Sequence, residues 1–148
     1  MADLNVTYVS LSIIVLLLAT IQDIKQFAIS NVLTFTGMLA GLVLHMAFSG
    51  YSGFEHALEG LIVGLVMGEF AALYTKMGQG DVFLLTALGS FIGPMPVMET
   101  FLFTFTILSI RFLPTFLKGS IINRKIAVAP YITAGALIAF IFRLTMNI

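Results

Sequence analysis

Three carboxylic acids lie beside or within apolar segments of this chain, where ionisable groups are rare. Asp23 follows the first apolar segment, Glu69 lies inside the third, and Asp81 directly precedes the fourth. An acid at membrane depth is costly and usually marks a functional site. Two carboxyl groups that meet and share a proton can hydrolyse a peptide bond. The ionised acid takes a proton from water, and the protonated acid polarises the scissile carbonyl.

The stretch "MGQGD", residues 77–81, places glycines immediately before Asp81. Glycine allows an extended substrate backbone to approach closely, and it tolerates unusual dihedral angles before a helix begins. One alternative is that Asp81 simply caps the next helix, because Asp is a favoured N-cap residue. Another is that Asp23, Glu69 and Asp81 bind a proton or cation in a non-catalytic membrane protein, either a small transporter or an assembly factor.

The composition of the chain requires an apolar environment. Of the 148 residues, 59% are hydrophobic and 9% are charged, whereas an average soluble domain is about 25% charged. So little charge leaves no polar surface to cover a soluble core, so the sequence predicts an all-α, polytopic membrane protein. The net charge of +0 argues against nucleic acid as a partner. The absence of cysteine excludes disulfides and Cys-ligated metal centres.

About six apolar segments are candidates to cross the bilayer core, which needs roughly 17–25 apolar residues. They cover residues 6–20, 32–48, 58–74, 82–92, 97–112 and 126–142. The fourth segment is too short to cross at full thickness, so we expect it to begin below the interface or to continue into "GPMPVM". No linker divides the chain, which predicts a single membrane-embedded domain over residues 1–148.

Basic residues gather at one end of the predicted segments. That end carries Lys25, Lys76, Arg111, Lys118, Arg124 and Lys125. Lys and Arg in short loops remain in the cytoplasm, and only Arg143 lies near the opposite end. The distribution therefore predicts that both termini are non-cytoplasmic and that Asp23 and Asp81 face the cytoplasm.

Glycines recur at intervals of four residues in two of the segments. Gly60, Gly64 and Gly68 share one helical face, and Gly37 and Gly41 have the same spacing. Small residues at this spacing let helix backbones touch. The pattern therefore predicts closely packed helices.

The stretch "MGQGDVFLLTALGSFIG" resembles the GxGD motif of the prepilin peptidases, a family of intramembrane-type aspartic proteases. A second stretch, "DIKQFAISNVLT", is similar to the first-aspartate motif of that family, and "RKIAVAPYITAGALIA" resembles its last span. The resemblance covers nearly the whole chain in the same order. It indicates a short-form prepilin peptidase of the type IV prepilin leader peptidase family.

The resemblance implies an aspartic endopeptidase with catalytic residues Asp23 and Asp81 and motif residues Gly78, Gly80 and Asn31. Its substrate would be a type IV prepilin or pseudopilin, cleaved behind a short basic leader at the cytoplasmic face of a prokaryotic inner membrane. The lipid bilayer would be the other partner, and no metal or organic cofactor is implied. With 0 cysteines, the chain is not expected to contain the cytoplasmic cysteine-rich methyltransferase domain of long family members.

Two residues depart from the pattern of the family. Ser30 stands where a proline is usual, and Phe83 stands where many bacterial members have lysine. Glu69 is a candidate for tuning the aspartate pair, the alternative being a hydrogen bond to a neighbouring helix hydroxyl. His45 is predicted to be an isolated histidine at the membrane interface.

Overall fold

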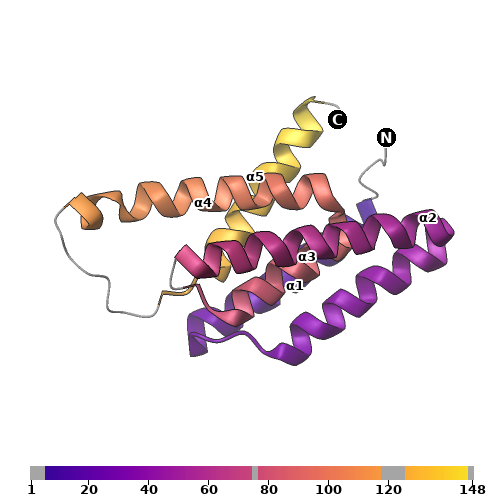
Figure 1. Ribbon diagram of the computed structural model, residues 1–148, viewed down its shortest axis with the longest axis horizontal. Coiled ribbons are helices and arrows are strands. Elements are labelled where there is room, and N and C mark those ends of the chain that lie inside the picture. Colours follow the sequence, from indigo (N-terminus) through magenta and orange to yellow (C-terminus); the bar gives the residue numbers. More distant parts are fainter. Residues whose placement is uncertain (1–5, 75–76, 118–125, 147–148) are drawn as a thin grey trace.

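The computed structural model describes residues 6–74, 77–117 and 126–146, which form five helices without any strand. These are α1 (Val6–Gln26), α2 (Asn31–Tyr74), α3 (Gln79–Ile92), α4 (Pro94–Leu117) and α5 (Ala129–Met146). Figure 1 shows α3 inside the bundle, with α2 folded around it. The prediction of an all-α chain is confirmed for these residues.

Four of the described helices are long and apolar enough to cross a membrane. They are Val6–Gln26, Asn31–Leu73, Pro94–Phe112 and Ala129–Met146. The fifth, α3, is a shorter apolar helix of 14 residues. The count of about six spans is therefore not confirmed. α3 is too short to be counted with the four, and the predicted segments 32–48 and 58–74 correspond to the two arms of α2, which meet at Gly50.

The backbone of Gly50 reverses the direction of α2. A straight helix of 44 residues would be about 66 Å long, which is twice the hydrocarbon thickness of about 30 Å. Gly50 instead has φ 65° and ψ −151°, outside the helical region, and Figure 1 shows α2 turning back there as two arms. A positive φ of this kind is easily reached only by glycine.

Both arms of α2 contact α3 through glycines. A Cβ atom added at Gly64 would lie 2.6 Å from the carbonyl oxygen of Leu85, and one added at Gly68 would lie 3.0 Å from Val82. Gly37 in the first arm lies against Ala87. The glycine spacing thus correctly predicted close packing. Residues 84–92 of α3 are all buried, as expected for a helix that is apolar on every side.

The sequence analysis expected the fourth segment either to begin below the interface or to continue into "GPMPVM", and the end of α3 rules out the second expectation. The helix stops at Ile92, Gly93 adopts φ 81°, and α4 begins at Pro94. "GPMPVM" therefore does not lengthen the fourth segment. Proline suits the first position of a helix, where its missing N–H would have no intrahelical partner, so Gly93 and Pro94 together produce the sharp change of direction.

His45 is buried, so the prediction of an isolated interfacial histidine is wrong. Its Nε2 lies 2.9 Å from the carbonyl oxygen of Phe91. Its ring stacks on Tyr8 with centroids 4.0 Å apart. The last carbonyls of a helix lack intrahelical donors, and His45 supplies one to the end of α3. This contact links α2 and α1 to the end of α3 that is remote from Asp81.

The contact at Gly64 generates a prediction about stability. We expect Gly64→Leu to lower the thermal stability and the membrane abundance of the protein. Overpacking a core usually costs about 1–3 kcal/mol, and here the obstacle is the backbone of α3 rather than a movable side chain. Thermal unfolding in detergent measures the effect.

The matched control is Val66→Leu, which enlarges a side chain that is 61% exposed on the same helix. It should leave the unfolding temperature unchanged. Equal unfolding temperatures for the Gly64 and Val66 variants would contradict the packing.

Candidate active site

Asp23 lies in the last turn of α1, where its carboxyl group is bound by the beginning of α5. Its Oδ2 accepts a hydrogen bond of 2.9 Å from the backbone N–H of Ala129, and the residue is 4% exposed. The first N–H groups of a helix have no intrahelical acceptor and carry partial positive charge. Asp23 thus fills an acceptor position at the start of α5 while remaining buried.

Ala129 is a site residue that the sequence analysis did not single out. It is the first residue of α5, and Pro130 follows it. Proline in the first turn is a usable signal for a helix start, and it could have placed a free N–H here. No sequence signal connects that N–H to an acid 106 positions earlier, because the contact depends on how α1 and α5 pack.

Asp81 is the third residue of α3 and reaches back over its beginning. Its Oδ2 accepts a bond of 3.2 Å from the N–H of Gly78, the N-cap residue. This is the acidic half of a capping box, and glycine has no side chain to provide the other half. The alternative that Asp81 is itself the N-cap is therefore wrong, although its carboxyl group does satisfy an N–H at the helix end.

One oxygen of Asp81 remains available. Among the described residues, the buried side-chain oxygens that lack a hydrogen-bond partner are Oδ1 of Asp81 and the hydroxyl of Tyr8. A buried polar atom without a partner is costly. At this end of the bundle, Oδ1 of Asp81 is thus a buried acceptor without a donor. Asp81 as a whole is 7% exposed.

The two aspartates lie at the same end of the bundle. The end of α1 and the beginnings of α3 and α5 are neighbours in Figure 1, and Asp23 bonds to the first residue of α5. Gly80, the residue before Asp81, packs closely on the turn that follows Asp23. A Cβ atom there would lie 3.1 Å from Cβ of Ile29 in the turn between α1 and α2.

Of the other predicted site residues, Gly78 bonds to Asp81 through its N–H, whereas Gly80 and Asn31 lie nearby with no recorded hydrogen bond to either acid among the described residues. Gly78 is exposed and Gly80 is half-buried. Asn31 is the exposed first residue of α2, and its carbonyl accepts a bond of 3.1 Å from the hydroxyl of Thr34. Asn31 therefore begins a helix beside the site, and the structure records no hydrogen bond from it to either aspartate within the described ranges.

Glu69 and Phe83 flank the first turn of α3. Glu69 is half-buried and follows Gly68, which packs on Val82. Its backbone therefore lies near the depth of Asp81, and a tuning role remains a prediction. Phe83 packs on Phe35 with ring centroids 5.4 Å apart. At position 83, where many bacterial family members have a charged lysine, this chain therefore has an aromatic ring that pairs with another ring.

The described side chains contain no group of three or more His, Asp or Glu residues that could hold a metal ion. The site therefore consists of two carboxyl groups, each bound on one oxygen by a backbone N–H. A pair of this kind can exchange protons with a water molecule and with a carbonyl oxygen.

These observations define a multi-pass α-helical membrane protein with two buried carboxyl groups at one end of its bundle. The chain belongs to the type IV leader peptidase family, whose model matches residues 10–113. The match includes Asp23 and Asp81 and ends before α5, and it confirms the family that the motifs indicated. Neither a curated protein nor a solved structure matches the chain significantly.

Proposed function

We propose that this protein is an aspartic endopeptidase that removes the leader peptide of type IV prepilins or prepilin-like proteins. The observation that carries the proposal is that Asp23 and Asp81, which belong to two different helices, lie buried at the same end of the bundle (Figure 1). Membership of a leader peptidase family supports peptide hydrolysis. The roles of the two acids are argued from their surroundings.

The two carboxyl groups would hold one proton between them, because like charges in close proximity disfavour double ionisation. The ionised acid accepts a proton from the attacking water, and the other donates to the oxygen of the scissile carbonyl. The titration belongs to the pair rather than to one residue. The unpaired Oδ1 of Asp81 is the oxygen best able to take up water or substrate.

The position of the pair suits a substrate that carries its own apolar helix. Such a substrate is held in the membrane plane, which restricts its diffusion and fixes its depth, so that the scissile bond is oriented before reaction. Exposed Gly78 and half-buried Gly80 border Asp81 without side chains. An extended leader could therefore lie close to the backbone at the start of α3.

The proposed location is a prokaryotic inner membrane, with the aspartates on the cytoplasmic side. Lys25 and Arg111 are exposed, and Lys25 follows Asp23 closely on α1. The other basic residues of that end, Lys76, Lys118, Arg124 and Lys125, lie outside the described residues. They support the orientation only through their place in the sequence.

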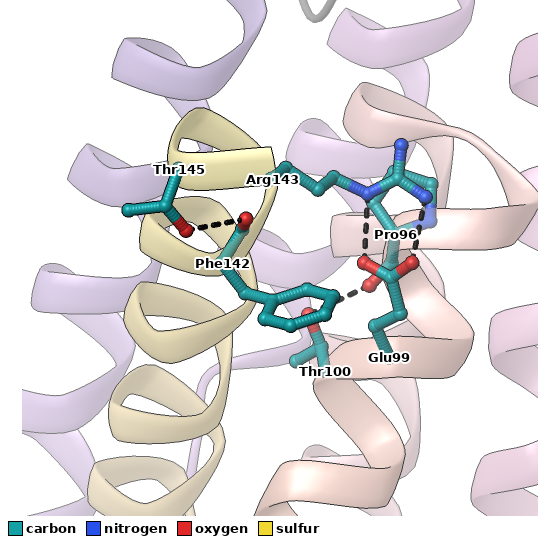
Figure 2. Close-up of polar contacts among 6 residues, drawn as sticks. All are labelled: Pro96, Glu99, Thr100, Phe142, Arg143 and Thr145. Carbon is teal, nitrogen blue, oxygen red and sulfur yellow. Dashed lines mark hydrogen bonds and ion pairs between the residues drawn. The ribbon is translucent and has the colours of Figure 1, made fainter. Parts of the chain in front are cut away.

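Arg143 near the opposite end is bound by Glu99. Figure 2 shows its guanidinium facing the carboxylate, with hydrogen bonds of 2.7 Å from Nε and 2.8 Å from a terminal nitrogen. The two side chains are 11% and 25% exposed. A bidentate pair of this kind is geometrically specific, so it joins α4 to α5 and compensates the one charge that departs from the orientation rule.

The dyad is tested by coexpressing the protein with a prepilin and measuring leader removal. Asp23→Asn and Asp81→Asn should each lower the cleavage rate by about 10²–10⁴-fold, the usual contribution of a general acid or base. Asn is nearly isosteric with Asp but cannot exchange protons. Both variants should accumulate in the membrane at close to normal levels.

Glu59→Gln makes the same chemical change in the second arm of α2, away from the aspartates, and should cleave normally. If Asp23→Asn or Asp81→Asn retained the wild-type rate, the two-aspartate mechanism would be wrong for this protein.

The orientation is tested with single cysteines in a chain that has none of its own. A membrane-impermeant maleimide should label Lys25→Cys only in inverted membrane vesicles, and Tyr51→Cys only in intact spheroplasts. Tyr51 is 69% exposed beside the bend of α2, at the opposite end from Lys25. The reverse labelling pattern would overturn the proposed orientation.

A further inference from the structure

A hydrogen bond closes the turn between α1 and α2 next to the first aspartate. The backbone N–H of Ser30 donates to Oε1 of Gln22 across 3.0 Å. Within this turn, Phe27 has φ 49°, and its N–H donates to the carbonyl oxygen of Asp23 across 2.8 Å. The side chain before Asp23 and the carbonyl of Asp23 itself therefore both bond to the turn that follows.

The same turn contacts the residue before the second aspartate. Ile29 is 8% exposed. A Cβ atom on Gly80 would lie 3.1 Å from its Cβ and 3.4 Å from its backbone nitrogen. Ile29 therefore rests directly on the backbone of Gly80, and a displacement of the turn would alter its contact with the start of α3.

These contacts form a short continuous path between the two carboxyl groups. From Asp23 the path passes to the adjacent Gln22 and across the hydrogen bond to Ser30. It continues from Ile29 to Gly80, the neighbour of Asp81. The Gln22 side chain makes one step of this path, its hydrogen bond to Ser30. This side chain can be removed by mutation while the packed side chain of Ile29 is left intact.

We propose that Gln22 is a positioning residue that sets the separation of Asp23 and Asp81. This inference rests on the proposed function of the two acids. Serine has a free N–H and a rotatable φ, whereas proline has neither, so at position 30 this chain uses a side-chain acceptor to restrain the turn. The carbonyl of Ser30 separately accepts the N–H of Thr34 at 3.3 Å, so α2 can still begin when Gln22 is absent.

The kinetic test compares Gln22→Ala with Gln26→Ala. Both replace a glutamine in the last turn of α1, and Gln26 is exposed with no side-chain hydrogen bond recorded among the described residues. We expect Gln22→Ala to lower kcat for prepilin cleavage about 10–100-fold with KM unchanged, since small displacements of catalytic groups have effects of this order. Gln26→Ala should match the wild type.

Rescue distinguishes positioning from a general loss of stability. Adding Ser30→Pro to Gln22→Ala removes the N–H that needs an acceptor and restrains φ at that residue. The double variant should recover most of the lost kcat. A loss of kcat that Ser30→Pro does not restore, or an unchanged kcat in Gln22→Ala, would overturn the proposal.

A distance measurement tests the inference without using activity. Lys25→Cys and Gln79→Cys place spin labels on exposed residues at the end of α1 and the beginning of α3. Electron–electron resonance in nanodiscs should show a broader distance distribution after Gln22→Ala and a narrow one again after Ser30→Pro. Identical distributions in all three proteins would refute positioning by Gln22.

The two experiments also separate this inference from the proposed function. A protein that cleaves no prepilin but shows the broadened and restored distributions would contradict peptidase activity while supporting control of the aspartate separation by Gln22. A protein that cleaves prepilin at the same kcat with and without Gln22 would support the peptidase and reject the inference.

Discussion

The contact between the glycine face of α2 and the backbone of α3 is the constraint on which the site depends. Gly64 leaves so little space beside the carbonyl of Leu85 that any side chain would separate the helices, and Gly68 makes a similar contact with Val82. Val82 follows Asp81 directly. The position of the second acid is therefore determined by backbone contact, which is less adjustable than contact between flexible side chains.

Burial of two acids is expensive, and helix beginnings offset part of that cost. Asp23 receives the N–H of Ala129 from α5, and Asp81 receives the N–H of Gly78 at the start of its own helix. Both donors are groups that have no intrahelical acceptor. Asp81 is held through Oδ2 alone, and its buried Oδ1 has no hydrogen-bond partner.

The sequence predicted the parts of this arrangement that depend on local patterns. Acids beside apolar segments indicated Asp23 and Asp81, and the spacing of Gly60, Gly64 and Gly68 indicated a close helix contact that the structure confirms. The approach of the two acids was a hypothesis from their motifs.

Contacts between residues distant in the chain were not predictable in the same way. The bond from Ala129 to Asp23 requires α5 to begin beside the end of α1, and the burial of His45 requires Tyr8 and the end of α3 on either side of its ring. The reversal at Gly50 depends on one backbone conformation, so hydropathy located the apolar segments on either side of it but could not show how the chain turns back between them.

The short length of α3 connects its packing to its proposed chemistry. Fourteen residues make a helix of about 21 Å, roughly 9 Å less than the hydrocarbon thickness of about 30 Å. A helix exposed to lipid could not end inside the bilayer without leaving polar backbone groups unsatisfied. Here residues 84–92 of α3 are buried in protein, and exposure begins only at Gln79 in its first turn. Asp81, two residues further along and 7% exposed, therefore lies where the helix passes from its exposed start into the interior of the bundle.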